Sequence, residues 1–385
     1  TTIDTTSAAV ANAANTSGGV SSADAAFAAV SAQDASGAVT ASLVDTGTSS
    51  SIETIVDGAV TSSSIVSDSN TLRAGATANS GLTAVALDAT NVNTTASVVN
   101  GQQSDAAVSA QIGVAAALNL GGVTLRADGA ITDSTLSVAS NLTSGSVTGN
   151  AGTNSLSMTG TNIATGSITT IGAVAAANAS ATADASLSNT QDAQTSVLNS
   201  SVFGTFGIDT DTTLASNAVD STISVDGNTQ SASTTGNTAT NTTRLDGSNV
   251  NTTSATTSVQ TVGVANLDAL SDVDMFVEAS AATSDISISA NRNQSVAVAN
   301  TAANTVSVTG ANVTSMRAAA ADDATASSLA DTASADHALL SSQTADGTVD
   351  STAVTDISNQ DVGVAPNNIA SSTIAFDRNV TIAES

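Results

Sequence analysis

Few residues in this chain could do chemistry. His337 is the only histidine, and there is no cysteine. A multi-histidine metal site therefore cannot be built within one chain, and disulfides, thiolate metal ligands and thiol catalysis are excluded. Because His337 lies in a polar, alanine-rich stretch, we interpret it as a solvated surface residue. The sequence contains no glycine-rich phosphate loop and no nucleophile elbow.

Paired aspartates are the remaining chemical candidates. Asp209 and Asp211 are two residues apart, as are Asp272 and Asp274, so each pair would point to one face of a strand. Paired carboxylates can hydrolyse glycosides, but a sugar site usually needs an aromatic platform, and the chain has only five aromatic residues, all Phe. Aspartate oxygens and turn carbonyls suit calcium better. We interpret the four aspartates as structural, keep calcium as their alternative ligand, and expect no catalysis and no other cofactor.

The charge balance limits the partners. Acidic residues number 33 against six basic ones, all Arg, for a net charge of -27. Such a surface repels nucleic-acid phosphates and anionic membranes. The chain has no apolar run of about 18 residues, so we expect no membrane span. Thr1 does not read as an initiator residue, and we expect a leader segment to have been removed before secretion.

Composition also describes the interior. With no Trp, no Tyr and few Phe, a core must be thin and lined by small side chains. Low complexity and high charge would suit a disordered chain. The hydrophobic fraction of 41% and the single proline favour an ordered one instead.

Internal repeats are the strongest pattern in the sequence. Four segments align without a gap, at residues 65–92, 136–163, 223–250 and 286–313, and a partial fifth covers 374–385. Composition does not shift along the chain. We therefore expect one elongated repeat domain over residues 1–385.

Asparagine recurs at fixed points of these repeats. In the third copy, Asn228, Asn237 and Asn249 lie between the opening Ile223 and the closing Val250. Asn tolerates the left-handed backbone region and bonds nearby backbone, so we expect corners there, and stacked Asn can form amide ladders. The predicted corner residues are Asn70, Asn141, Asn228, Asn237, Asn249, Asn291, Asn300 and Asn312.

The segments between these asparagines have the length of strands. Aliphatic residues 22 positions apart, such as Ile223 and Leu245, suggest one coil of a β-solenoid. We predict an all-β protein, an elongated β-solenoid of irregular repeats, with a β-sandwich subunit that donates a terminal strand as the alternative. Two alanine-rich stretches, 5–35 and 316–345, could instead be helical.

The strings SVQTVGVAN from Ser258 and SNQDVGVAPNN from Ser358 resemble the Ser–Gln–Gly–Asn pattern of curlin repeats. More broadly, the chain resembles bacterial β-strand-repeat proteins of extracellular fibres and cell-surface adhesins. It departs from curlin in its irregular period and sparse Gln. The resemblance implies a secreted protein, extracellular or on the cell surface.

The partial fifth repeat suggests how such a protein would assemble. Ile374, Phe376, Val380 and Ile382 would present an apolar face beside an open strand edge. We expect copies of the chain to join head to tail there as the subunits of a filament. The alternatives are a monomeric adhesin or surface-layer stalk and, less favoured, a β-helix enzyme acting on polysaccharide. A surface or matrix polysaccharide is a further candidate partner.

Overall fold

The protein is built from strands. The computed structural model describes residues 2–4, 10–16, 19–43, 52–105, 107–114, 121–164, 173–174, 179–194, 197–210, 217–263, 266–314, 319–322, 332–360 and 371–385. Every regular element within these ranges is a strand, which confirms the all-β class. The helical alternative is wrong where the alanine-rich stretches are described, since they form β2–β4 and β30–β32. None of the described residues belongs to a helix that could span a membrane.

The chain runs through five stacked passages, which we call layers and number in chain order. The first layer contains β4 (Phe27–Ala35), β5 (Val39–Leu43), β6 (Ile52–Val56), β7 (Val60–Thr61), β8 (Ser64–Asp68), β9 (Thr71–Asp88) and β10 (Asn91–Asn93). The second contains β11 (Ala96–Ser104), β12 (Val108–Ile112), β13 (Gly121–Ala127), β14 (Ile131–Thr132), β15 (Thr135–Ala139) and β16 (Leu142–Ala164). The third contains β19 (Ala185–Ala193), β20 (Val197–Thr210), β21 (Ala218–Val219), β22 (Thr222–Asp226) and β23 (Thr229–Asn251).

The last two layers follow the same path. The fourth contains β24 (Ser254–Val262), β25 (Asn266–Glu278), β26 (Ala281–Ala282), β27 (Asp285–Ser289), β28 (Arg292–Thr309) and β29 (Asn312–Val313). The fifth contains β32 (His337–Ala345), β33 (Thr348–Gln360), β34 (Thr373–Asp377) and β35 (Val380–Glu384). The strands outside the layers are β1 (Thr2–Asp4), β2 (Val10–Thr16), β3 (Gly19–Ala25), β17 (Ala173–Val174), β18 (Ala179–Thr182), β30 (Ala319–Asp322) and β31 (Thr332–Ala335).

Corresponding strands of successive layers pair in parallel and in register. Leu136 of β15 lies between Ile65 of β8 and Ile223 of β22. Ile223 in turn pairs with Ile286, and Ile286 with Ile374. The ungapped alignment of the repeats is therefore the register in which their strands pair.

The expectation of a 22-residue coil is wrong. Ile223 and Leu245 lie in the same layer, on β22 and β23. Residues that pair between layers are separated by 63 positions at Ile223 and Ile286 and by 90 at Val108 and Leu198. The recurrence at 22 residues reflects two inward-facing positions on one wall, because a layer folds back on itself and needs many more residues to close.

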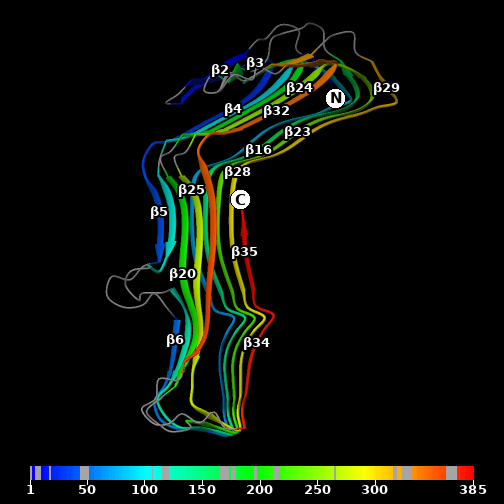
Figure 1. Ribbon diagram of the computed structural model, residues 1–385. Helices are drawn as coiled ribbons and strands as arrows, with labels where there is room; N and C mark the ends of the chain where they lie inside the picture. Colours follow the sequence, from blue (N-terminus) through cyan, green and yellow to red (C-terminus); the bar gives the residue numbers. More distant parts are fainter. Residues whose placement is uncertain are drawn as a thin grey trace.

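Each layer runs along one wall and returns along the other, and the stack is bent at an elbow (Figure 1). One wall consists of the sheets through β11 and β20, and the other of the sheets through β15, β16 and β23. Because only about 4.8 Å separates neighbouring strands, five layers form a slab that is thin along the stacking direction and long within each layer.

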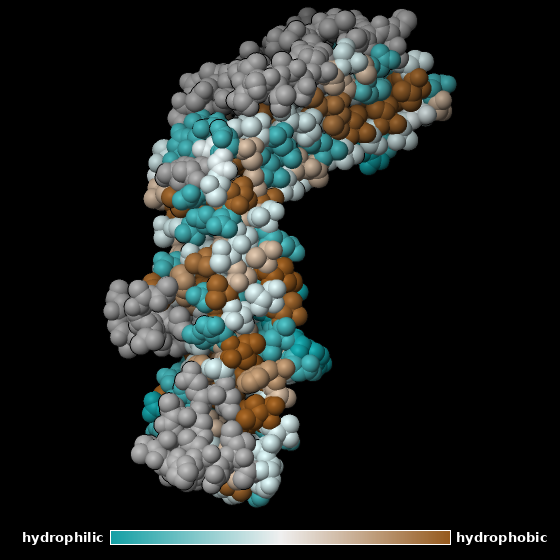
Figure 2. All heavy atoms as spheres, viewed as in Figure 1, coloured by the Kyte–Doolittle hydropathy of each residue, from teal (hydrophilic) through white to brown (hydrophobic). Residues whose placement is uncertain are grey.

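The space between the walls holds three apolar clusters. The first lies at the β14 end and contains Phe206, Leu136 and Ile223, each fully buried. The second lies along the straight part and is lined by Ala, Val, Leu and Ile. The third lies beyond the elbow and includes Met158 and Leu245. On the visible outer surface, apolar and polar residues are interspersed in small patches (Figure 2).

The sequence did not predict a further six-stranded sheet, whose strands come from the segments that precede or connect the layers along the chain. Strands β2, β3, β17, β18, β30 and β31 pair antiparallel with one another. This antiparallel sheet covers the outer face of one wall, the parallel sheet that contains β11, β19, β24 and β32. Because that sheet is covered on both faces, β11, β19 and β24 are buried along almost their whole length. Alternation disappears in such strands.

The register makes a stability prediction at Ile223, which is fully buried in the first apolar cluster. Ile223→Asp places an unpaired carboxylate there and should lower the free energy of unfolding by about 3 kcal/mol or more. Urea denaturation followed by circular dichroism measures it. Ser224→Asp, on the outward-facing neighbour, is the control and should change stability by less than about 1 kcal/mol. Equal losses in the two variants would contradict the assigned facing.

Candidate functional site: polar ladders and end layers

A column of asparagines joins all five layers at one corner. Asn70, Asn141, Asn228, Asn291 and Asn379 each lie between two strands of their layer. The backbone N–H of each of the first four donates to the side-chain Oδ1 in the next layer, with N–O distances of 2.9, 3.0, 2.9 and 3.1 Å along the column. Each Nδ2 from Asn70 to Asn291 also donates to the next Oδ1, at 2.8 to 3.0 Å. We call this column the corner ladder.

The corner ladder also reaches backward along the stack. Nδ2 of Asn228 donates to the carbonyl of Val138 in the layer before it, at 2.9 Å. Asn141, Asn291 and Asn379 do the same with the corresponding carbonyls of their preceding layers. An interior asparagine therefore binds both neighbouring layers, and its corner exists only within a stack.

The left-handed backbone at this corner belongs to the residue before the asparagine, which corrects the sequence-based reasoning. The φ angles are 56° at Ser69, 55° at Ser140, 66° at Gly227, 56° at Ala290 and 54° at Arg378. Since that residue turns the chain, the asparagine keeps its side chain aligned with the stack. The ladder selects Asn for its paired donor and acceptor rather than for its tolerance of positive φ.

A second corner ladder, made of serines, was missed. The backbone N–H groups of Ser63, Ser134, Ser221 and Ser284 donate to the Oγ of the next layer's serine at 3.1 to 3.2 Å, ending at Ser372. The preceding residues again have positive φ, from 48° to 58°. The sequence signal was present, because a serine stands two residues before the opening aliphatic residue of every repeat.

Asn237 lies within β23 at the elbow and not between strands. It belongs to a buried ladder of Asn79, Asn150, Asn237 and Asn300 whose Nδ2–Oδ1 distances are 2.7, 2.8 and 2.9 Å. Each Nδ2 also donates across the interior to a carbonyl of the facing wall, as Asn237 does to Thr261 at 2.8 Å. This ladder ties the two walls together, which a corner residue would not do.

The facing wall contains a corresponding column of glutamines, formed by Gln33, Gln102, Gln191, Gln260 and Gln343. The Nε2 of each later residue donates to the Oε1 of the one before it, at 2.6 to 2.9 Å. From Gln33 to Gln260, Nε2 also donates to a carbonyl of the opposite wall, for example Ser80 at 2.9 Å. We call this column the glutamine ladder. It too was missed, although Gln occupies the seventh position of five alignable nine-residue segments.

Asn249 and Asn312 lie in a third, exposed asparagine ladder at the tip of the slab. Asn312 donates to Asn249 at 2.8 Å and Asn249 to Asn162 at 2.7 Å. Both are strand residues, and their hydrogen bonds join side chains of neighbouring layers, so they differ from the predicted corners that bond backbone amides. Because these side chains are exposed, water competes for their hydrogen bonds, and the ladder contributes less to stability than a buried one.

The aspartates do not converge into a site. Asp209 lies on β20, where burial raises its pKa, Arg126 lowers it, and Glu278 lies nearby. Asp211 is outside the described residues. Asp272 and Asp274 lie on β25 beside Asp356 of β33. Among the described residues, no group of three or more His, Asp or Glu is arranged to hold a metal ion.

His337 is not the solvated residue that we expected. It opens β32, is half-buried, and its Nδ1 lies 2.9 Å from the Oγ of Ser254 in the fourth layer. Burial lowers its pKa. The neighbouring Asp336 carboxylate acts against this shift. Through the Ser254 contact, His337 continues the stacking contacts of its sheet.

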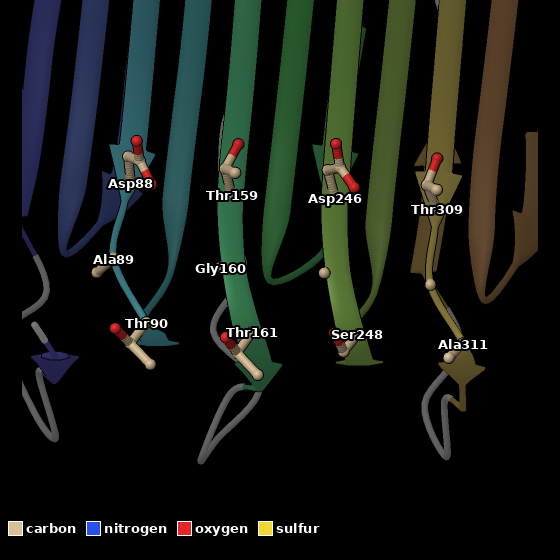
Figure 3. A pocket seen from close by; sticks show the side chains of 12 residues that line it. Asp88, Ala89, Thr90, Thr159, Gly160, Thr161, Asp246, Ser248, Thr309 and Ala311 are labelled. Carbon is tan, nitrogen blue, oxygen red and sulfur yellow. The ribbon is translucent and has the colours of Figure 1, made fainter.

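A shallow groove runs across the tip of the slab (Figure 3). It is formed by the same turn in four successive layers and is lined by small residues. The lining residues are Asp88, Ala89, Thr90, Thr159, Gly160, Thr161, Asp246, Gly247, Ser248, Thr309, Gly310 and Ala311. No aromatic residue lines it, so it lacks the platform that a sugar ring usually needs.

The fifth layer is the last that the described residues form, and its outer strand edge has no partner strand among them. Ile374 and Phe376 pair with Ile286 and Ile288, so they continue the inward-facing columns of the first cluster, yet they are 37% and 51% exposed. Val380 and Ile382 pair with Arg292 and Gln294 and face outward. The four residues therefore do not share one apolar face as expected, because the corner at Asn379 separates two strands of opposite facing.

The chain matches no protein-family model, and neither a curated protein nor a solved structure shows significant similarity to it.

The corner ladder makes a graded prediction. Asn228→Ala removes a fully buried amide that bonds both neighbouring layers, and should cost about 2 kcal/mol of unfolding free energy, between 1 and 3. Asn249→Ala, in the exposed ladder, should cost about 0.5 kcal/mol or less. Chemical denaturation of both variants gives the comparison. A larger loss at Asn249 than at Asn228 would contradict the assigned roles.

Stability should increase on mild acidification. Burial raises the pKa of Asp192, Asp209, Asp268, Asp272, Asp274 and Glu278. A carboxyl whose folded pKa is raised contributes stability that is complete below its unfolded pKa, near 4, and is lost as pH rises through the folded value. The lowered pKa values of His337 and of Asp128 beside Arg126 act in the opposite direction.

Among the described residues, six groups act against two, so the melting temperature should be higher at about pH 4.5 than at pH 7. Differential scanning calorimetry in dilute solution measures it. Asp272→Asn with Asp274→Asn should flatten the dependence, since both stack near Asp356. A melting temperature that falls steadily from pH 7 to 4.5 would count against this.

Proposed function

We propose that the chain is a β-solenoid in which each layer is one unusually long coil, and that it serves as the structural subunit of an extracellular filament. Parallel, in-register pairing of five layers supports the solenoid over the β-sandwich alternative, whose sheets are antiparallel. The observation that carries the function is the corner ladder. Each layer completes the hydrogen bonds of the layer before it, so both end layers carry the contacts of an interrupted stack.

Such a stack extends by adding another copy at either end. The open edges belong to different surfaces of the molecule, so the contact between copies is head to tail and does not close on itself. With neighbouring strands about 4.8 Å apart, each copy would add five layers and about 24 Å to the filament. The filament axis lies across the strands, in the direction of the amide ladders.

Charge and composition suit this role. The net charge of -27 keeps separate copies apart until specific contacts form. We propose that the protein is secreted and acts outside the cell or on its surface, as the resemblance to strand-repeat fibre proteins implies. We propose no catalytic role, since Asp209 and Asp272 lie on different parts of the wall and do not converge. The polysaccharide partner stays a prediction, and the tip groove is where it would be tested.

Electron microscopy and fibre diffraction of the purified chain test the proposal. We expect unbranched filaments with a meridional reflection at about 4.8 Å and an axial rise of about 24 Å per subunit. Isolated particles at every concentration, pH and salt condition would contradict it. They would favour the monomeric adhesin or stalk instead.

A further inference from the structure

The two end layers carry opposite halves of the corner ladder. Throughout the stack, a backbone N–H donates to the Oδ1 of the following layer. Within the described residues, no group donates to Oδ1 of Asn70, and the backbone N–H of Asn379 has no acceptor. The first layer therefore offers an acceptor, and the fifth layer offers the donor that fits it.

The hydrogen bonds of the glutamine ladder run from later to earlier layers, opposite to those of the corner ladder. They too leave an acceptor and a donor on the two end layers that fit each other. Each later Nε2 donates to the Oε1 of the layer before it. Gln33 already holds its Nε2 at the carbonyl of Ser80, as the interior glutamines do with their own carbonyls. Among the described residues nothing donates to Oε1 of Gln343. Two ladders of opposite direction both fit only when a fifth layer meets a first layer.

The register through the five layers fixes which residues would meet. Arg73 occupies the position of Ser144, Ser231, Gln294 and Ile382 in successive layers. Gly75 occupies the position of Glu384 in the same way. A first layer stacked on a fifth would thus place Arg73 over Ile382 and Gly75 over Glu384.

Arg73 is the arginine without a partner in the part of the chain that the structure describes. Arg126 and Arg244 each pair with the aspartate two residues later in the chain, and Arg292 bonds Gln294 in the same way. Arg378 pairs with its neighbour Asp377. The residue two positions after Arg73 is Gly75, which offers no side chain.

Glu384 would supply the missing carboxylate. Arg73 is exposed on the outward face of β9. Glu384 pairs in register with Val296, which belongs to the outward-facing residues of β28, so it faces outward too. In the stacked register their Cα atoms would be diagonal neighbours about 8 Å apart, a span that two long side chains bridge. Gly75 leaves the path between them open.

The strands at the two ends do not compete for the same place. β35 covers β28 from Arg292 to Val296, whereas β1 covers Asn91–Asn93 on the opposite side of the stack. Among the described residues, the register brings one pair of like charges directly together, Asp68 and Asp377. Arg378 already pairs with Asp377 there. The described end strands are therefore compatible in register and in charge.

We propose that copies join in the register of the stack itself, with Asn70 and Gln33 of one copy completing the ladders of Asn379 and Gln343 in another, and with Arg73 bound to Glu384. This inference rests on the proposed filament and adds its polarity, its register and its ion pair. The partner is a second copy of this chain, joined first layer to fifth layer.

Charge reversal in the full chain tests the joint. Arg73→Glu and Glu384→Arg should each raise the critical concentration for assembly by about tenfold, because each variant brings like charges together at its own joint. Mixed in equal amounts, the two variants restore an opposite pair at every joint. The mixture should therefore assemble nearly as the native chain does, as measured by sedimentation and microscopy.

Arg244→Glu is the matched control. It makes the same change in net charge on an exposed strand residue of the third layer, away from both ends, and should leave the critical concentration within about twofold. Far-ultraviolet circular dichroism verifies that every variant folds.

Cross-linking tests the register independently, because the chain has no cysteine of its own. A mixture of Arg73→Cys and Ile382→Cys chains should form a disulfide-linked heterodimer on oxidation, since directly stacked Cα atoms lie within disulfide range. Val380→Cys in place of Ile382→Cys is one diagonal step away and should cross-link at most one-tenth as well.

The outcomes separate the two proposals. Native chains that assemble, with variants that assemble equally well alone and no selective cross-link, would overturn this joint and leave the filament intact. Native chains that never assemble would overturn the filament and the joint together. Impaired single variants, rescued only by mixing, establish polarity and register.

Discussion

In-register stacking is the constraint on which the rest of this molecule depends. When a polar side chain lies between parallel layers, its donor and acceptor must meet their complements one strand spacing above and below. A carboxamide meets this demand with copies of itself, since it carries both groups. The buried columns of Asn and Gln follow from that requirement, and so do the runs of Ser and Thr around them. The same constraint explains why so few large side chains are needed. Buried polar side chains are satisfied mainly by hydrogen bonds to the equivalent side chains of the layers above and below, and less by the opposite wall.

The repeat alignment could be read from the sequence because it is the pairing register. Ile65, Leu136, Ile223, Ile286 and Ile374 occupy one position in five layers. The length of a layer could not be read in the same way. Between the repeats the chain passes through β11, β19 and β24, which are covered on both faces and so do not alternate. Their common feature is a glutamine at one position, a polar signal inside an otherwise buried strand.

The asparagines chosen from the sequence differ in geometry from the corners that were expected. The eight chosen asparagines all belong to ladders, but Asn237, Asn249, Asn300 and Asn312 lie inside strands and not at corners. A sequence offers no way to tell a corner amide from one that crosses the interior, because both demand the same spacing between copies. The apolar residues of the last repeat were similarly placed on one face, since the turn at Asn379 that reverses their facing depends on the left-handed Arg378. Because Arg378 is not a glycine, its left-handed conformation is set by the ladder bonds of the following Asn379 and not by its residue type.

The layers keep register while their connections differ in length. Seven residues separate β20 from β21 in the third layer, whereas two separate β25 from β26 in the fourth, and the strands on either side still pair residue for residue. Loop entropy rises only slowly with length, so added sequence at such a joint costs little stability. The architecture therefore separates a conserved-geometry scaffold from segments that are free to diverge. In the proposed filament, a peptide grafted into one of these connections would be displayed once per subunit at a fixed spacing, and the protein would then serve as a template for ordered arrays of foreign epitopes or enzymes.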